Sequence, residues 1–203
     1  MSRLSYLIPQ VILKTTSGYN QDIRIIEESG RLKLLVNGSR QSGRYIEWLW
    51  KKALNAFRIP PCQSILVLGV GGGTVIHLLH KRYPDAHITA VDIDPQMIDI
   101  GKKYFGLARV TNLVLVIANA KDYKITRAYD LVIVDLFIGR HIPEFVGNEK
   151  FLRRFRSSTI IINYLRELEY KEKSRKLVDV LEKIFPVVKN YQIAHNSFYF
   201  VVK

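Results

Sequence analysis

The feature that most constrains the fold of this chain is an alternation of short apolar runs with amphipathic segments, which begins near residue 64. Five of the runs are rich in Val, Ile and Leu and are apolar at consecutive positions, namely residues 65–68, 88–91, 113–117, 131–134 and 159–163. Such continuity is typical of strands covered on both faces, as in a parallel sheet. Amphipathic segments at residues 75–83 and 95–105 predict helices between them, so the alternation predicts βαβ units with right-handed crossovers.

The C-terminal part of the chain predicts two more strands. Residues 187–193 and 197–202 are separated by a short turn and follow an amphipathic helix that Pro186 ends. We therefore expect them to pair antiparallel at the edge of the sheet. Together with the five earlier runs they predict an α/β fold with a doubly wound, mostly parallel seven-stranded sheet and one antiparallel edge strand.

The N-terminal part has a different pattern. Residues 23–28 and 31–36 are two short extended segments, and the turn signal Ser29-Gly30 lies between them. This pattern predicts a short N-terminal β-ribbon. Residues 44–57 have apolar side chains at helical spacing, and two prolines stop this helix. We therefore divide the chain into an N-terminal β-ribbon extension over 1–43 and a main domain over 44–203.

The composition excludes several classes of protein. The 203 residues include 31 Lys and Arg against 18 Asp and Glu, a formal charge of +13, and 48% are hydrophobic. This hydrophobic share is too high for a disordered basic tail and is enough for one sizeable core. No run approaches the ~18 to 20 apolar residues of a membrane-spanning helix, and Pro9 and Lys14 interrupt the N-terminal apolar stretch. We expect a cytoplasmic protein with no membrane partner.

Cysteine and histidine patterns predict no metal site. The single cysteine, Cys62, excludes an intramolecular disulfide and a cysteine-rich zinc site. His77 and His80 stand three residues apart on one predicted helix with no acidic partner in the pattern. We therefore expect no metal cofactor and a structural role for Cys62.

The most informative motif is a glycine-rich turn between the first apolar run and the helix after it. The sequence SILVLGVGGGT contains Gly69, Gly71 and Gly73, and Asp92 ends the next apolar run nineteen residues later. Such a turn brings backbone amides close to a ligand, and an acidic residue at that place accepts hydrogen bonds from ribose hydroxyls. Thr74 stands where a dinucleotide-binding fingerprint has Gly or Ala, and no P-loop motif is present. The pattern favours binding of a nucleoside with an amino-acid tail. The alternative is that the glycines only let the strand and the helix pack closely.

Several motifs together identify a family. The segments YNQDI (19–23), LVNGSRQ (35–41), ILVLGVGGGT (65–74), AVDIDPQMIDIGKKYFGL (90–107) and YDLVIVD (129–135) follow one another as in that family. The chain resembles the spermidine synthase (polyamine aminopropyltransferase) superfamily, within the Rossmann-like class I S-adenosylmethionine-dependent methyltransferase fold. The resemblance implies that the domain over 44–203 is methyltransferase-like and binds a nucleoside. It also implies a transferase whose donor is S-adenosylmethionine or its decarboxylated form.

The resemblance also implies which residues hold the donor. Glycines of the turn would lie around its ribose and tail, an aspartate on its ribose hydroxyls, a short segment beside its adenine, and glutamines of the N-terminal ribbon over it. The corresponding residues here are Gly69, Gly71, Gly73, Asp92, Asn119, Ala120, Gln21 and Gln41. Family members usually have Asp where Asn119 stands, and either side chain can accept a hydrogen bond from the adenine amino group. For the two glutamines, an exposed polar place in a hairpin is the alternative.

Two departures from the family concern the reaction. Aminopropyltransferases carry an acidic residue at the position of Gly72, facing the cationic amine of the decarboxylated donor. The family's D-[ST]-[ST]-D-P is replaced here by DLFIG, which keeps only the first acidic residue, Asp135. In the family this residue orients or deprotonates the attacking amine; a helix cap or loop anchor is the alternative.

Both departures, with the charge of +13, disfavour a polycationic substrate. We therefore expect methyl transfer to an unknown small-molecule acceptor with Asp135 as the catalytic residue. Two alternatives remain, an aminopropyltransferase of polyamine biosynthesis and a non-catalytic nucleoside-binding descendant of the fold.

Other segments suggest further roles. The loop after Asp135 is bracketed by glycines and predicts a lid that carries His141 and Glu144 over the site. Two basic clusters, at residues 150–156 and 171–176, suggest nucleic-acid binding, but glutamates interleave with the second, and the motif of DNA-base amino methyltransferases is absent. Nucleic acid is therefore not the favoured partner. Relatives associate through the N-terminal ribbon, so a homodimer is also open.

Overall fold

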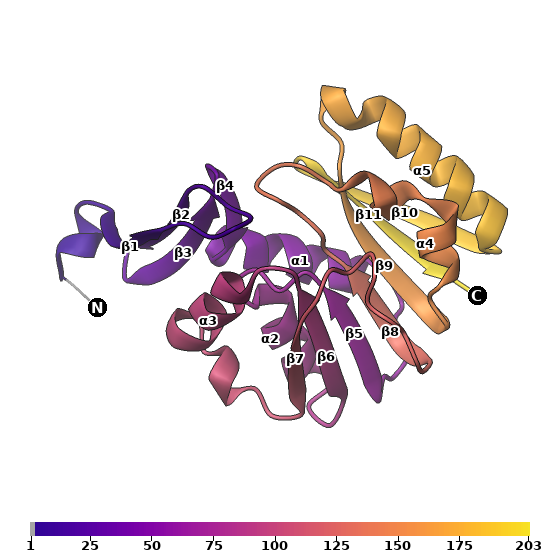
Figure 1. Cartoon of the computed structure of the whole chain (residues 1–203), viewed down its shortest axis with the longest axis horizontal. Coiled ribbons are helices and arrows are strands. Elements are labelled where there is room, and N and C mark those ends of the chain that lie inside the picture. Colours follow the sequence, from indigo (N-terminus) through magenta and orange to yellow (C-terminus); the bar gives the residue numbers. More distant parts are fainter. Residues whose placement is uncertain (1–2) are drawn as a thin grey trace.

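The structure is a computed structural model that describes residues 3–203, and it contains two sheets (Figure 1). The first is antiparallel, with its four strands in chain order: β1 (Gln10–Thr15), β2 (Ile23–Glu28), β3 (Arg31–Val36) and β4 (Ser39–Ser42). The predicted ribbon is present as β2 and β3. The strands β1 and β4 were not predicted, because β1 lacks a clear alternation of buried and exposed positions and β4 has no apolar residue.

The second sheet has seven strands in the order β10-β11-β9-β8-β5-β6-β7. Their bounds are Ser64–Leu68 (β5), His87–Asp92 (β6), Leu113–Ile117 (β7), Tyr129–Val134 (β8), Ser157–Leu165 (β9), Val187–Ile193 (β10) and Asn196–Val202 (β11). Strands β5 to β9 pair parallel, and β11 pairs antiparallel with both of its neighbours. All five apolar runs and the C-terminal pair are confirmed as strands, and so is the predicted fold class.

The place of the antiparallel strand differs from the prediction. Strand β11 is not at the edge but lies between β9 and β10, and β10 forms the edge. The physical reason is burial: nearly every residue of β11 is buried, whereas β10 alternates between exposed and half-buried positions. The more apolar strand of the hairpin therefore takes the inner position.

Helices cover both faces of the seven-stranded sheet (Figure 1). On one face lie α1 (Arg44–Ala56) and α2 (Thr74–Arg82), and on the other lie α4 (Glu149–Arg153) and α5 (Lys171–Ile184). Short 3-10 turns occur at Arg3–Tyr6 (η1), Leu107–Arg109 (η2), Glu144–Gly147 (η3) and Leu168–Tyr170 (η4). The expected helix after β6 is α3 (Pro95–Tyr104), and Asp94 caps it by accepting a hydrogen bond from the backbone N–H of Gln96 at 3.0 Å.

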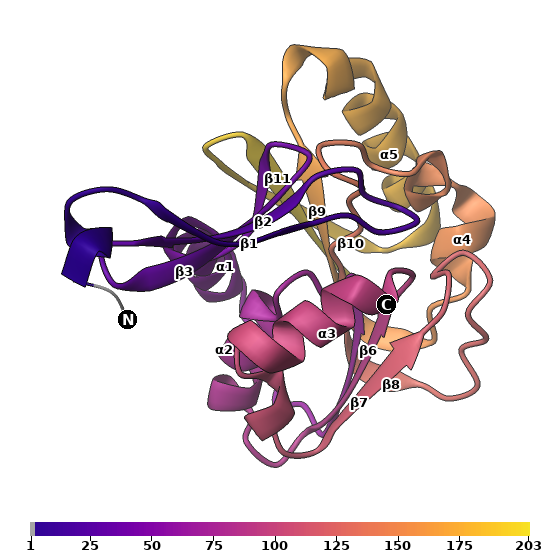
Figure 2. The same cartoon turned by 60° about the vertical axis from the view of Figure 1, so that its left-hand side comes forward.

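The N-terminal sheet packs on α3 (Figure 2). Apolar side chains of β2 and β3 form a small core with Met97 and Ile100 of α3. At one end of this contact, Ser17 Oγ and Asn20 Nδ2 donate to the buried carboxylate of Asp94 at 2.5 and 2.8 Å. These contacts hold β4 over the loops that follow the parallel strands. In the part of the chain that the structure describes, no helix is both long and apolar enough to cross a membrane.

Candidate active site

The topology places the sequence-predicted residues at one edge of the sheet. Strand order reverses between β5 and β8, and ligands of open α/β sheets bind in the crevice outside the carboxyl ends of the strands at such a point. Gly69 follows β5, Asp92 is the last residue of β6, Asn119 comes two residues after β7, and Asp135 follows β8. The pattern of polar residues at the ends of apolar runs therefore marks one crevice.

Gly69 lets the glycine turn pass close to Asp135. Its φ of 94° lies in the left-handed region, and a Cβ at this position would stand 2.0 Å from the carbonyl oxygen of Asp135. Gly71, at φ 53°, approaches Gln41 in the same way, with 3.3 Å from a Cβ to the Gln41 carbonyl oxygen. The two glycines thus bring the ends of β5 and β8 and the strand β4 together around one space.

A small donor-side cavity of about 40 Å³ lies in this space. Of the residues predicted from the sequence, it is lined by Gln41, Gly69, Gly71, Asp92 and Asp135. Other predicted donor residues do not line it. Gly73 precedes α2 and packs against Leu107, where a Cβ would stand 2.4 Å from the side chain. At Gly73 the turn therefore allows close packing against Leu107 and does not contribute to the cavity.

The adenine-side residues Asn119 and Ala120 also lie outside the cavity. The Asn119 side chain accepts a hydrogen bond from the backbone N–H of Lys121 at 2.9 Å, so it stabilises the turn after β7. Gln21 is exposed and does not line the cavity. The cavity therefore includes the predicted ribose-side residues, whereas Asn119 and Ala120 follow the strand that pairs with β6 and lie outside the cavity lining.

Asp92 organises the glycine turn. Its two carboxylate oxygens accept hydrogen bonds from the backbone N–H groups of Val70 and Asp94, at 2.8 and 2.9 Å. Burial raises the pKa of Asp92 above its usual range, and the backbone hydrogen bonds oppose that rise. Carboxylate oxygens have several acceptor positions, so this side chain can hold the turn and still accept from ribose hydroxyls.

A loop closes the donor-side cavity from above. Gln41 Nε2 of β4 donates to the carbonyl oxygen of Gly139 at 2.8 Å, and Ile138 and His141 pair in an isolated bridge. Small-molecule sites usually have volumes of ~300 to 1,000 Å³, so with the loop in this position the donor side is nearly closed. The loop stands where the sequence predicted a lid.

The residues of this loop that face the site differ from those predicted. His141 and Glu144 are exposed and line neither the donor-side cavity nor the larger cavity beside it, which is described below. Phe137 lines both cavities, Ile138 lines the donor-side cavity, and Arg140 lines the larger cavity.

The position of Gly72 is filled by the N-terminal sheet. Its backbone N–H donates to Ser42 Oγ at 2.9 Å, and a Cβ there would stand 2.6 Å from the same oxygen and 3.2 Å from the Phe105 ring. Ser42 is buried. An acidic side chain at this position therefore requires Ser42 to move, so the absence of the family's carboxylate is part of the packing of this chain.

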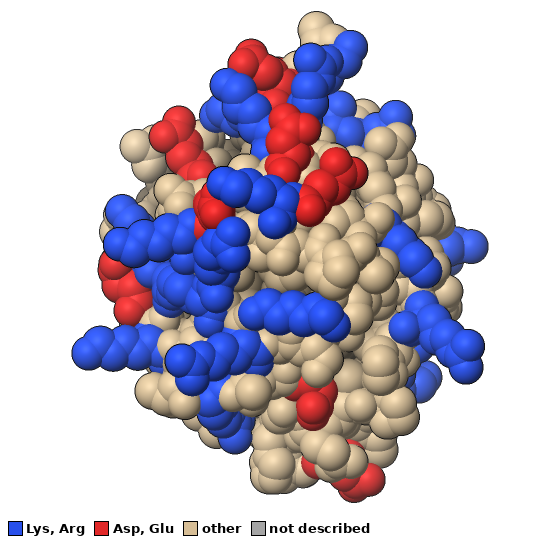
Figure 3. Space-filling view, turned by 90° about the vertical axis from the view of Figure 1, so that its right-hand side faces the viewer, with Lys and Arg blue, Asp and Glu red and all other residues tan. Residues whose placement is uncertain are grey.

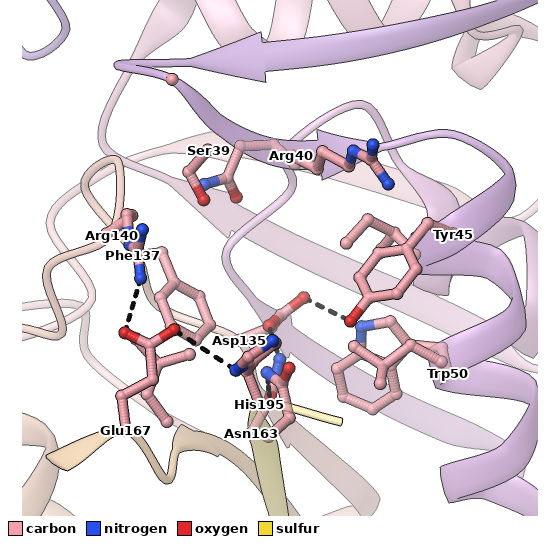
Figure 4. Close-up of a pocket in the computed structure, with 16 residues that line it drawn as sticks. Ser39, Arg40, Tyr45, Trp50, Asp135, Phe137, Arg140, Asn163, Glu167 and His195 are labelled. Carbon is pink, nitrogen blue, oxygen red and sulfur yellow. Dashed lines mark hydrogen bonds and ion pairs between the residues drawn. The ribbon is translucent and has the colours of Figure 1, made fainter. Parts of the chain in front are cut away.

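A second cavity of about 520 Å³ adjoins the donor side and is the larger part of the site (Figure 4). It is formed by β4, α1, the loop after β8, and the carboxyl end of β9 with the β10–β11 turn. Its polar and aromatic lining includes Ser39, Arg40, Gln41, Tyr45, Trp50, Asp135, Phe137, Arg140, Asn163, Glu167, His195 and Asn196. We call it the acceptor pocket. Asp135 and Phe137 line both cavities and so stand between them.

Asp135 is held by two side-chain donors at the floor of the acceptor pocket. Trp50 Nε1 donates to Oδ2 at 3.2 Å and Asn163 Nδ2 donates to Oδ1 at 2.8 Å. Asn163 Oδ1 in turn accepts from Asn196 Nδ2 at 2.8 Å, which fixes the orientation of the Asn163 amide. Burial raises the pKa of Asp135 to about 6, against the lowering effect of the two hydrogen bonds. Near neutral pH this carboxylate is mainly ionised and has a pKa suited to accepting a proton.

The rim of the acceptor pocket carries charged side chains (Figure 4). Arg140 Nη2 lies 2.5 Å from Glu167 Oε2, and His195 Nδ1 lies 3.7 Å from the other oxygen of Glu167. The guanidinium of Arg40 lies over the Tyr45 ring, 5.5 Å from its centroid. None of the described acidic side chains forms an ion pair with Arg40.

Most residues of the acceptor pocket were missed by sequence reasoning. Asn163 had a usable signal, because it ends an apolar run on the strand next to the one that ends before Asp135. Trp50, Arg40 and Asn196 had none, because only the packing of α1, β4 and the β10–β11 turn brings them to the pocket.

The predicted basic clusters are partly engaged in structural contacts. Arg153 and Lys183 both pair with Glu149 at 2.8 Å, and Arg154 donates to backbone carbonyls of the turn after β7. On α5, Lys176 pairs with Glu172 at 2.8 Å, as the interleaved glutamates predicted. Figure 3 shows acidic side chains among the basic ones at the top of this face, mostly Lys and Arg across its middle, and further acidic side chains near its lower end. Nucleic-acid binding stays a prediction. Among residues 3–203, no group of three His, Cys, Asp or Glu side chains is placed to hold a metal ion.

Comparisons with known proteins bear on the fold and the family. The profile of a family described as a methyltransferase domain matches residues 65–158. A polyamine aminopropyltransferase of Vibrio vulnificus is 35% identical over 99 residues, which are 46% of this chain and 33% of that protein. An eEF1A lysine and N-terminal methyltransferase homolog of Drosophila melanogaster is 28% identical over 155 residues, 64% of this chain and 22% of that protein. The chain thus spans a third or less of the length of these two relatives.

Among solved structures, spermidine synthase from Thermotoga maritima superposes with a TM-score of 0.75 at 16% identity, over 96% of this chain and 73% of that one. The fold is therefore the class I methyltransferase-like, Rossmann-like fold that spermidine synthases share. The resemblance to the spermidine synthase-like superfamily, stated from the motifs, is confirmed, and the similar proteins are transferases of methyl or aminopropyl groups.

Proposed function

We propose that this protein is an S-adenosylmethionine-dependent transferase that moves a methyl group to an acceptor bound in the acceptor pocket. The observation that carries the proposal is the place of Asp135, which lines both the donor-side cavity and the acceptor pocket. A nucleophilic N–H or O–H that accepts a methyl group loses its proton, and a carboxylate where the two substrates meet can accept that proton.

The residue types that line the donor-side cavity are suited to an adenosyl donor. Gly69 and Gly71 line the donor-side cavity without side chains, and Asp92 lines the same cavity. The donor-side cavity is too small for a nucleoside, so donor binding requires the loop after β8 to move outward. This movement breaks the hydrogen bond between Gln41 of β4 and Gly139 of the loop. When bound, S-adenosylmethionine supplies an electrophilic methyl group on a sulfonium.

The chemistry assigned to this chain's own residues is proton acceptance and orientation. A lone pair of the acceptor attacks the methyl carbon, the carbon–sulfur bond breaks, and its electron pair stays on sulfur. The proton of the acceptor N–H or O–H passes to the Asp135 carboxylate and then to solvent. Trp50 and Asn163 hold that carboxylate in place throughout.

The geometry at Gly72 favours the intact donor over the decarboxylated one. Decarboxylation leaves a cationic amine without a carboxylate beside it, and a neighbouring acid is how an enzyme would bind it. Here Ser42 fills that position, and residue 72 has no side chain. Aminopropyl transfer is the second candidate, favoured by the retained Asp135 and by the similarity to the aminopropyltransferase of Vibrio vulnificus.

Calorimetry with both donors tests the proposal. We expect S-adenosylmethionine and S-adenosylhomocysteine to bind more tightly than decarboxylated S-adenosylmethionine. The Asp135→Asn variant should retain donor binding and lose turnover by about a hundredfold or more. Preference for the decarboxylated donor would establish the second candidate. Binding with no turnover of any acceptor in the wild type would indicate a non-catalytic nucleoside-binding protein, and absence of binding by all three nucleosides would refute the proposal.

A further inference from the structure

We propose that the acceptor carries an anionic group, a carboxylate or a phosphate, that Arg40 binds while the acceptor's nucleophilic N–H or O–H faces Asp135. This inference rests on the proposed function, because it names the class of molecule that the acceptor pocket takes. It depends on how charges are arranged around the pocket.

The pocket has one carboxylate and one guanidinium without a partner of opposite charge. Its lining contains two described acidic residues, Asp135 and Glu167. Glu167 is engaged by Arg140 at 2.5 Å and by His195 at 3.7 Å, so little of its charge is available to a ligand. Asp135 receives only the neutral donors of Trp50 and Asn163. A diamine would find one available carboxylate here, not two.

Arg40 provides the opposite charge on a different wall. It comes from β4, whereas Asp135 follows β8, and Figure 4 shows the Arg40 side chain above the pocket, on the side away from Asn163 and His195. Arg40 is exposed, and its guanidinium lies over the Tyr45 ring, 5.5 Å from the ring centroid. A guanidinium held in this way presents a pair of N–H donors that suits a carboxylate or a phosphate.

The two charges together select against a polyamine. An ammonium group of a diamine that reached the rim would face Arg40, a like charge, and would gain nothing there. An amine or alcohol with an anionic far end would satisfy both walls. The volume of about 520 Å³ is ample for such a molecule.

Binding of matched pairs of small molecules tests this inference without any need for turnover. The probes are 4-aminobutyrate against 1,4-diaminobutane, their homologues of three to six carbons, and phosphoethanolamine against ethanolamine. Each is titrated calorimetrically into the wild type, into Arg40→Gln and into the control Arg44→Gln. Arg44 is an exposed arginine at the start of α1 that does not line the acceptor pocket.

We expect the anionic member of at least one pair to bind tenfold or more tightly than its partner, and Arg40→Gln to remove that preference while Arg44→Gln keeps it. Tighter binding of the diamines, an unchanged preference in Arg40→Gln, or no binding of any anionic probe would overturn the inference. Donor binding is measured in the same preparations. Its loss with retained preference for anionic probes would refute the proposed function and leave the pocket assignment standing.

Discussion

At the scale of single residues, burial makes the ionised form of Asp135 unfavourable in the folded protein. The carboxyl has a pKa of about 6 against a reference value of 3.8, and the main cause is burial. The folded protein therefore holds this proton more strongly than the unfolded chain does. The resulting stability is fully present below pH 3.8 and is lost as the pH rises through about 6. Two pKa units correspond to at most about 3 kcal/mol.

The Asp135→Asn variant should remove this pH-dependent part of the stability. Asparagine does not titrate, so we expect the free energy of unfolding of the wild type to fall by about 1 to 3 kcal/mol between pH 4 and pH 7 relative to that of the variant. Urea unfolding at a series of pH values measures the difference in slope. Asp179→Asn, on the exposed side of α5, is the matched control and should keep the wild-type slope. Parallel curves for the wild type and Asp135→Asn would contradict the prediction.

The backbone conformation and close packing at position 69 require glycine. Alanine would have to adopt a φ of 94° and place its Cβ 2.0 Å from the carbonyl oxygen of Asp135. We expect Gly69→Ala to destabilise the fold by about 3 kcal/mol or more, a fall in melting temperature of roughly 6 °C or more. Gly18→Ala is the control, since a Cβ there meets no atom within 4 Å. Equal melting temperatures for the two variants, by calorimetry, would show that the turn adapts without cost.

At the scale of elements, the site is assembled by a short strand that has no hydrophobic signal of its own. β4 carries Arg40, Gln41 and Ser42, which contact the acceptor pocket, the loop at Gly139 and the glycine turn respectively. It pairs only with β3, and the pairing includes a register shift between Leu34 and Leu35. The packing of β2 and β3 on α3 therefore determines where these three side chains stand.

The link between β4 and the loop above the donor side should control how easily that loop opens. Gln41→Ala removes the 2.8 Å hydrogen bond to Gly139, and such a bond stabilises by about 0.5 to 1.5 kcal/mol. We expect hydrogen exchange at the backbone amides of Ile138 and His141 to become about two- to tenfold faster. Gln192→Ala, on the exposed edge strand β10, is the control for a glutamine lost elsewhere. Unchanged exchange in Gln41→Ala would mean that other contacts hold the loop.

The elements differ in how far their own sequence predicts them. The central strands were predictable because each is a continuous apolar run, and Gly69, Asp92 and Asp135 were predictable because each follows or ends such a run. β4 and the acceptor pocket were not, because their residues are polar or aromatic and come from segments distant in the chain. The order of β10 and β11 was missed because an adjacent hairpin can attach by either strand; burial of β11 decides it.

At the scale of the whole molecule, the charge of +13 is spread over surfaces with different roles. Part of it supports the structure, since Arg154 binds backbone carbonyls and Arg153 and Lys183 share Glu149. Another part, Arg40, lies at the acceptor pocket. Exposed apolar side chains also occur on β1, such as Val11, and between η1 and β1, such as Leu7. A homodimer through the N-terminal ribbon stays a prediction.

The remaining excess charge should bind polyanions weakly and without sequence preference. Contacts between Lys or Arg and phosphates release counterions, so the affinity falls steeply with salt. We expect single-stranded RNAs of different sequence and heparin to bind with similar affinity at 50 mM salt, and to lose about tenfold or more of it by 200 mM. Fluorescence anisotropy measures this. Donor binding by calorimetry at the same salt concentrations should change little, because the donor contacts that we propose are hydrogen bonds to the glycine turn and Asp92. An RNA that keeps its affinity at 200 mM salt, or that depends on one sequence, would instead assign a specific nucleic-acid partner to this basic surface.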